Sequence, residues 1–262
     1  SQLRSVQLEI KKGELVILAG RSGCGKTTLT RVMNGLCPHF YPGRLEGSYL
    51  LDGEDARNMP VHKLGTIVGS VFQDPRSQFF TTNTTDEIAL GMENIPLERS
   101  VMQERMKRVC AQMNMERLLH RSIFPLSSGE KQRTAVASVY AMNPPVYVCD
   151  EPTANLDGKG IEELREVLQS LKQEGCTLLI AEHRLFWLMD VADRFVYIRD
   201  GAIQWEHTPK QMRLFPSEVM KQLELRAVQH CMPSRLSIPA ITGSPLLSLK
   251  SLSCKRGKHT IW

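Results

Sequence analysis

Hydrophobic and polar residues follow two different periods along this chain, and together they predict an α/β fold. Apolar runs of strand length occur at 14–19, 146–149 and 177–181, and each is too short to form an independent helix. Apolar residues with helical spacing occupy 29–36 and 135–140. We therefore expect buried strands and amphipathic helices within one α/β domain.

The first apolar run leads directly into a glycine-rich loop that suits a phosphate group. Glycines at 20, 23 and 25 let the backbone turn tightly, so that successive N–H groups converge on the phosphates. Lys26 adds a positive charge, the Thr27 hydroxyl is a ligand for Mg2+, and the helix that follows points its N-terminus at the phosphates. This order predicts a nucleoside triphosphate site. Its expected binding residues are Gly20, Arg21, Ser22, Gly23, Cys24, Gly25, Lys26, Thr27 and Thr28.

A second strand, at 146–149, ends in two adjacent carboxylates, Asp150 and Glu151. Because side chains alternate along a strand, these two should point in different directions. One can then hold Mg2+ while the other polarises a water for in-line attack on the γ-phosphate. Paired acids also occur in ordinary turns, and only the phosphate loop favours the catalytic interpretation.

Ser127 and Glu130 form an S-x-x-E capping box, which predicts the start of the amphipathic helix through 135–140. A helix N-terminus carries partial positive charge and free N–H groups, so it also suits a phosphate. Both roles, capping and phosphate binding, remain open for this segment.

The order of these segments resembles the ATP-binding cassette (ABC) ATPases over roughly residues 6–225. Beyond the phosphate loop, the resemblance is carried by Gln73, Leu126–Glu130, Asp150 with Glu151, Ala154–Asp157 and His183. It implies a P-loop NTPase fold of ABC type. In that fold a mostly parallel core sheet is flanked by helices and accompanied by an antiparallel β subdomain and a helical subdomain. The helical subdomain would lie at about 77–142 and would include the helical pattern at 97–120.

The resemblance also implies the roles of individual residues. Glu151 would be the general base or water-orienting residue, His183 the γ-phosphate sensor, and Gln73 a third catalytic residue that contacts Mg2+. A histidine at a strand end is often structural, with Glu182 and Arg184 as its partners. The implied Mg2+ ligands are Thr27, Gln73 and Asp150. The implied ATP contacts outside the loop are Ser127, Ser128, Gly129, Glu130 and Asp157. In the family, Leu126–Glu130 is the signature segment, whose serine and glycine reach nucleotide that is held by an opposite subunit.

Composition is typical of a cytosolic protein. No apolar stretch approaches the roughly 18 residues of a membrane span, and the start has no signal-peptide pattern. The seven cysteines form no CxxC pair, which favours reduced thiols.

The net charge of +5 is unevenly distributed. All 28 acidic residues and all but six of the 33 basic ones lie at or before Glu224, so the first 224 residues carry −1 and the remainder +6. A basic tail suits nucleic acid or anionic lipid. Prolines and glycine among these charges favour a linker at 226–245 instead.

Residues 246–258 resemble the opening strand of another cassette. We therefore expect an ABC domain at 1–225, a linker at 226–245 and the start of a second ABC domain at 246–262, as in the first half of a tandem protein. The alternative is a C-terminal strand that packs on the first cassette. The family's adenine-stacking aromatic would lie before Ser1.

Residues 71–94 and 34–43 are similar to energy-coupling factor (ECF) ATPases, which drive uptake of vitamins and transition-metal ions in prokaryotes. The resemblance implies ATP and Mg2+ as cofactors and a position on the cytoplasmic face of the membrane. The implied partners are a coupling protein whose helix docks near 73–80, a substrate-binding membrane component, and a second ABC domain in the same chain or in a homodimer mate. The alternatives are a soluble tandem ABC ATPase acting on ribosomes or nucleic acid, and an exporter subunit. The net charge of −1 over the first 224 residues argues against nucleic acid as a partner.

Overall fold

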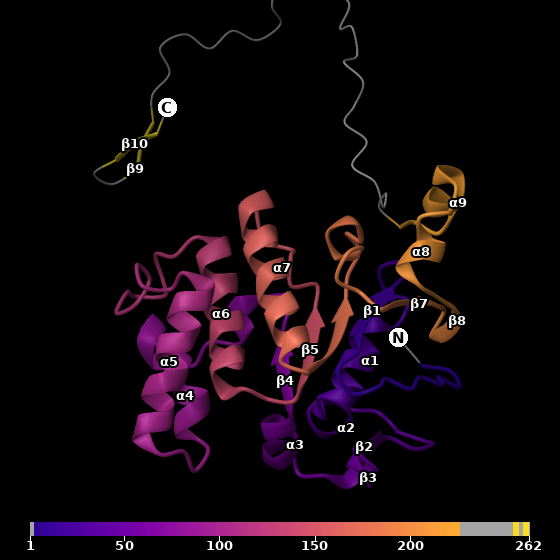
Figure 1. The fold of residues 1–262 in the computed structure, drawn as a ribbon, viewed down its shortest axis with the longest axis horizontal. Coiled ribbons are helices and arrows are strands. Elements are labelled where there is room, and N and C mark those ends of the chain that lie inside the picture. Colours follow the sequence, from indigo (N-terminus) through magenta and orange to yellow (C-terminus); the bar gives the residue numbers. More distant parts are fainter. Residues whose placement is uncertain (1–2, 226–253, 257–258, 262) are drawn as a thin grey trace, which may run out of the picture. The chain divides into compact units, whose positions relative to one another are not determined.

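The structure, a computed structural model, describes residues 3–225, 254–256 and 259–261, which fall into two units, 1–230 and 231–262. The first unit contains a six-stranded sheet in the order β4-β5-β6-β1-β7-β8 (Figure 1). Neighbouring strands from β4 to β7 are parallel, and β8 is antiparallel to β7. The strands are β1 (Leu15–Ala19), β4 (Val68–Val71), β5 (Val146–Asp150), β6 (Thr177–Ala181), β7 (Arg194–Arg199) and β8 (Ala202–His207).

The parallel strands of this sheet are buried on both faces, whereas every residue of β8 is partly or fully exposed. Successive residues of β1 belong to different apolar clusters, with Leu15 and Ile17 in one and Val16 and Leu18 in the other. A parallel strand covered on both faces is apolar at every position, which explains why these runs show no alternation in the sequence. Helices α6 (Ser128–Met142) and α7 (Gly158–Gln173) contribute to the first cluster, and α1 (Lys26–Met33) and α3 (Val61–Ile67) to the second.

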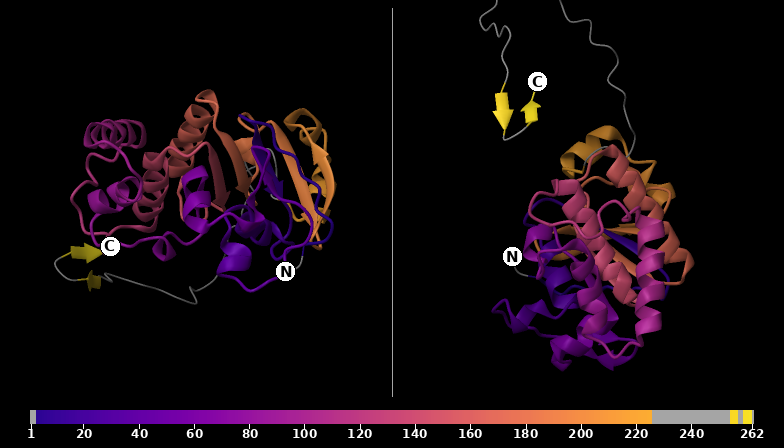
Figure 2. Two further views of the ribbon diagram at one scale, coloured as in Figure 1. Left: turned by 90° about the horizontal axis from the view of Figure 1, so that it is seen from below. Right: turned by 90° about the vertical axis from the view of Figure 1, so that its left-hand side faces the viewer.

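Three helices lie side by side next to the β4 edge of the sheet. Helices α4 (Thr84–Glu93) and α5 (Arg99–Met113) both pack against α6, as Figures 1 and 2 show. The Asn83 side chain accepts a hydrogen bond from the Thr85 N–H and so caps α4. All three helices fall inside the helical subdomain predicted at about 77–142, whose boundaries stay a prediction.

The remaining elements are short. They are α2 (Leu36–His39), β2 (Leu50–Leu51), β3 (Glu54–Asp55), η1 (Ala56–Asn58), η2 (Pro75–Ser77), η3 (Phe186–Leu188), α8 (Pro209–Met212), α9 (Ser217–Gln222), β9 (Cys254–Arg256) and β10 (His259–Ile261). Strands β2 and β3 pair antiparallel, so the predicted fold class, a mostly parallel sheet flanked by helices with antiparallel strands beside it, is confirmed.

In the second unit, β9 and β10 form an antiparallel pair, with His259 opposite Arg256. The predicted linker at 226–245, and most of the predicted second domain at 246–262, lie outside the described residues. Among the helices that the structure describes, none is long and apolar enough to cross a membrane.

Gly69 gives a test of how closely α6 approaches the sheet. A Cβ at this position in β4 would lie 2.5 Å from Pro144 Cγ and 2.6 Å from Val139 Cγ1. We expect Gly69→Ala to lower the free energy of unfolding by about 1–3 kcal/mol through overpacking. Gly65→Ala, in α3, is the matched control, because a Cβ there meets nothing within 4 Å and alanine favours the helix by about 0.5–1 kcal/mol. Urea unfolding measures both, and equal shifts would contradict the packing account.

Candidate functional site

The loop from Gly20 to Thr27 joins β1 to α1 and folds around the ammonium group of Lys26. Lys26 is 4% exposed, and its Nζ donates hydrogen bonds to the carbonyl oxygens of Gly20 at 2.8 Å and Arg21 at 3.0 Å. Gly20 has a φ of 151°, and a Cβ there would lie 2.3 Å from the Ile198 carbonyl oxygen. Only glycine permits this approach, so the loop geometry depends on it.

A polar cavity of about 180 Å³ opens at the N-terminal end of α1. Its walls come from four separate parts of the chain, which meet because the parallel strands β1, β4, β5 and β6 end at the same edge of the sheet. The residues that line it are Ser22, Gly23, Gly25, Lys26, Thr27, Gln73, Glu151 and His183. Such a crevice at the carboxyl ends of parallel strands is the usual place for a ligand in an open α/β sheet.

Four predicted phosphate-loop residues do not form the cavity wall: Gly20, Arg21, Cys24 and Thr28. Arg21 forms an ion pair with Glu224 near the end of the first unit. Cys24 is buried, with its Sγ 3.9 Å from Lys26 Nζ. Thr28 lies one residue further along α1 than Thr27, which does line the cavity.

Asp150 is a buried carboxylate next to the loop. It is 7% exposed, the Thr27 hydroxyl donates a hydrogen bond to it, and its Oδ1 has no hydrogen-bond partner in the described structure. Burial raises the pKa of Asp150, and the Thr27 hydrogen bond opposes that shift. A buried carboxylate oxygen without a partner, beside a hydroxyl, fits a hard cation such as Mg2+. Bound there with Gln73 nearby, Mg2+ would neutralise charge on the β- and γ-phosphate oxygens.

Glu151, Gln73 and His183 lie together at one side of the cavity. His183 Nε2 lies 2.8 Å from Glu151 Oε1, and Gln73 Nε2 donates to Glu151 Oε2 at 3.1 Å. The Lys26 Nζ is 3.4 Å from the same His183 nitrogen. Glu151 has a φ of 46°, a left-handed conformation that costs free energy for a residue with a side chain and occurs often at active sites. The structure therefore brings together the three residues predicted as catalytic.

Glu182 holds the backbone next to the cavity, at the start of the turn that carries His183. It is 3% exposed, and its Oε1 accepts hydrogen bonds from the backbone N–H groups of His183 at 2.8 Å and Arg184 at 3.1 Å. The Thr153 hydroxyl donates to its other oxygen. Glu182 is thus a partner of His183, as the structural alternative for this histidine allowed, and it holds the backbone of His183. A buried acid directly after a strand was the available signal.

The signature segment and Asp157 lie apart from the cavity. Ser127 Oγ accepts from the Glu130 N–H at 3.3 Å, and Glu130 Oε2 accepts from the Ser127 N–H at 2.8 Å, so the predicted capping box is confirmed. This backbone hydrogen bond lowers the pKa of Glu130. Asp157 Oδ1 accepts from the Gly160 N–H at 2.8 Å and caps α7. The predicted ATP contacts that do not line the cavity here are Ser127, Ser128, Gly129, Glu130 and Asp157.

The pKa of Asp150 leads to a stability test. Because burial raises the pKa in the folded chain above its unfolded value, ionisation of Asp150 reduces stability as pH rises from the unfolded pKa through the folded one. We expect Asp150→Asn to unfold at a higher temperature than the parent at neutral pH, with the difference vanishing in acid, below about pH 4. The same variant should lose the Mg2+ dependence of nucleotide binding. A lower unfolding temperature at neutral pH would contradict the account.

The family model described as ABC transporter matches residues 3–154, more than half of the chain. A protein of Treponema denticola, provisionally named an ABC transporter ATP-binding protein, is 43% identical over 226 residues, covering 86% of this chain and 46% of the relative. A protein of Pyrococcus horikoshii with a similar provisional name is 39% identical over 241 residues, covering 90% of this chain and 81% of the relative. The chain thus spans less than half of the first relative's length.

Solved structures share the fold. The structure of cbiO1 from Clostridium perfringens, described as part of the ABC transporter complex cbiONQ, has a TM-score of 0.72 and 30% identity, covering 86% of this chain and 88% of that chain. The ATP-binding cassette MJ0796, solved as a dimer in a post-hydrolysis state bound to ADP and Pi, has a TM-score of 0.70 and 25% identity, covering 79% and 90% of the two chains.

The parallel sheet, the phosphate loop and the paired carboxylates at its edge define a P-loop ATPase domain of the ABC type. The chain belongs to the ABC transporter family. Members of this class bind ATP with Mg2+. In this chain the unpartnered Oδ1 of Asp150, beside the Thr27 hydroxyl, is a suitable ligand for that metal.

Proposed function

We propose that this chain is the ATP-hydrolysing cassette of an ECF-type ABC importer of a vitamin or metal ion, driven by ATP-dependent pairing of two cassettes. One observation carries the proposal. The cavity gathers the phosphate loop, Gln73, Glu151 and His183, whereas the helix N-terminus at Ser127–Glu130 lies elsewhere on the same chain. A second cassette would supply that N-terminus to complete the site.

Each residue of the cavity then has a task. Lys26 exchanges its two carbonyl partners for phosphate oxygens, and the N-terminus of α1 adds its free N–H groups. Glu151 accepts the proton of the attacking water, or orients that water, while the Gln73 amide holds one of its oxygens. His183 lies against the other oxygen and senses the γ-phosphate.

The second cassette belongs either to the same full-length protein or to a homodimer mate. The tandem form is supported by the Treponema denticola relative, of which this chain covers 46%. The homodimeric form is supported by the Pyrococcus horikoshii relative, of which this chain covers 81%. In either form we place the cassette on the cytoplasmic face of the membrane, beside a coupling protein and a substrate-binding membrane component.

The surface near Gln73 suits a helix of the coupling protein. Phe80 is 84% exposed and Phe124 is 73% exposed, whereas Phe79 is partly buried. The Ile123 N–H donates to the Thr82 carbonyl at 2.9 Å, so the two segments run side by side. Two exposed aromatic rings on adjacent segments suit an apolar helix of a partner.

Co-purification from membranes tests this partner. We expect the chain to co-purify with a hydrophobic membrane protein, and Phe80→Ser combined with Phe124→Ser to lose that association while ATP binding remains. Leu214→Ser is the matched control, because Leu214 is 81% exposed at a different part of the surface. Co-sedimentation with ribosomes in place of membrane protein would favour the soluble tandem ATPase and contradict the importer.

A further inference from the structure

The two segments that would contact the opposite cassette lie next to each other in this chain. A Cβ on Gly129, in the signature segment, would lie 3.8 Å from the Asn155 carbonyl oxygen and 4.0 Å from Leu156 Cδ2. The signature segment begins α6, and Asp157 caps the start of α7. The position of one helix N-terminus therefore constrains the position of the other.

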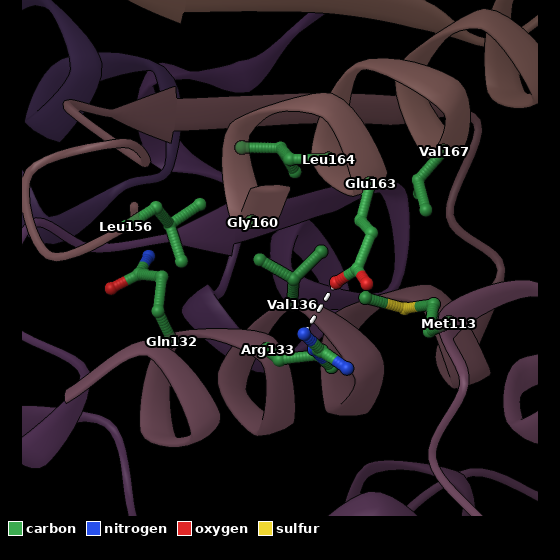
Figure 3. A pocket seen from close by; sticks show the side chains of 9 residues that line it. All are labelled: Met113, Gln132, Arg133, Val136, Leu156, Gly160, Glu163, Leu164 and Val167. Carbon is green, nitrogen blue, oxygen red and sulfur yellow. Dashed lines mark ion pairs between the residues drawn. The ribbon is translucent and has the colours of Figure 1, made fainter. Parts of the chain in front are cut away.

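An ion pair joins the two helices just behind these N-termini. Arg133 Nη2 contacts the Glu163 carboxylate, and the two side chains are 26% and 18% exposed (Figure 3). Each residue lies in the second turn of its helix, counted from Ser128 in α6 and Gly158 in α7. The Glu163 carboxylate also has Lys159 at 3.7 Å, but the Lys159 side chain is 83% exposed and water competes for it.

Beside this ion pair the contact between the helices is mostly apolar and imperfectly packed. A cavity of about 20 Å³ lies between the helices, walled by Val136, Leu156 and Leu164 (Figure 3). Gln132 also borders it, is fully buried, and has neither its amide oxygen nor its amide nitrogen in a hydrogen bond within the described structure. Apolar contacts are non-directional, and an unpaired amide adds no orientation. The Arg133–Glu163 ion pair is therefore the charge–charge contact between the two helices beside their N-termini.

We propose that Arg133 and Glu163 are positioning residues that hold the signature segment and Asp157 at the spacing needed to engage the opposite cassette together. The inference rests on the proposed pairing of two cassettes. Neither residue touches nucleotide in this scheme, since both lie behind the helix N-termini that do. A partly buried pair of opposite charges suits this task, because moving the helices apart would leave each charge desolvated without its partner.

ATP-dependent dimerisation tests the inference. It is measured by sedimentation, and every chain carries Glu151→Gln to slow hydrolysis. Adding Glu163→Gln should weaken ATP-dependent dimerisation about tenfold, while labelled-ATP binding to the single chain stays unchanged. Exchanging the charges, with Arg133→Glu and Glu163→Arg together, should restore it, and Arg133→Lys should retain most of it. Glu162→Gln is the matched control, because Glu162 pairs with Arg165 at the surface of the same helix.

The outcomes separate the inference from the function beneath it. If the Glu151→Gln parent does not dimerise with ATP, the proposed pairing fails and the inference falls with it. If the parent dimerises and Glu163→Gln does so equally well, the inference alone is overturned, even where thermal unfolding shows a loss of stability. Should the exchanged chain fail to fold, Arg133→Lys decides: retained dimerisation supports the positioning role, and a loss as large as that of Glu163→Gln overturns it.

Discussion

Glu151→Gln is expected to bind ATP normally and to lose turnover by a factor of about 10² to 10⁴, the contribution typical of a general base. Glutamine keeps the size of the side chain and can still contact Gln73 and His183, but it cannot accept the proton of the attacking water. Steady-state phosphate release measures turnover, and titration with labelled ATP measures binding in the same preparation.

Glu104→Gln controls for the loss of one carboxylate, because Glu104 is an exposed residue of α5, far along the chain from every cavity residue. Its turnover should match that of the parent chain. Unchanged hydrolysis in Glu151→Gln would remove Glu151 from the mechanism and leave Asp150 as the acid to examine.

Lys26→Ala should act on binding itself. The Lys26 ammonium is the positive charge at the floor of the cavity, and a hydrogen bond from a charged group contributes about 1.5–3 kcal/mol. We therefore expect ATP affinity to fall roughly ten- to a hundredfold. Lys107→Ala, which removes the same charge from an exposed position on α5, should leave affinity unchanged. Equal affinities for the two variants would show that the loop does not hold the phosphates through Lys26.

The local features of this fold were predictable from the sequence. The apolar run at 14–19 became β1 (Leu15–Ala19), because a continuous apolar stretch of this length suits a strand covered on both faces. The capping box at Ser127 was predictable because its two hydrogen bonds join residues only three apart. The assembly of Gln73, Glu151 and His183 was expected only through the family resemblance.

Other features depend on contacts between distant segments. Arg133 pairs with Glu163, and Asn155 Nδ2 donates to the Gln73 carbonyl at 3.3 Å. Both contacts require the packing of distant helices and loops, which no local sequence pattern encodes. The left-handed backbone of Glu151 follows from the turn after β5 and not from the preference of glutamate. The roles assigned to the site residues stay predictions, because they concern nucleotide and a second cassette.

The central claim is that the site is completed by another cassette, and mixing two inactive variants of this chain tests it most directly. Lys26→Ala damages the phosphate loop and keeps the signature. Ser128→Glu keeps the loop but adds a negative charge at the N-terminus of α6, where it would repel the phosphates of the opposite cassette. An acidic residue in the first turn of a helix is favourable, so α6 itself should still form. In a mixed pair, the intact loop of the Ser128→Glu chain faces the intact signature segment of the Lys26→Ala chain, so one of the two sites is undamaged.

Each variant alone should show little turnover, and an equal mixture should recover about a quarter of the parent's turnover, since about half of the pairs are mixed and each has one intact site of two. Phosphate release from the mixture, against each variant and the parent chain, is the measurement. Absence of recovery, under conditions where the parent hydrolyses ATP, would show that the site is complete within one chain and would contradict the account.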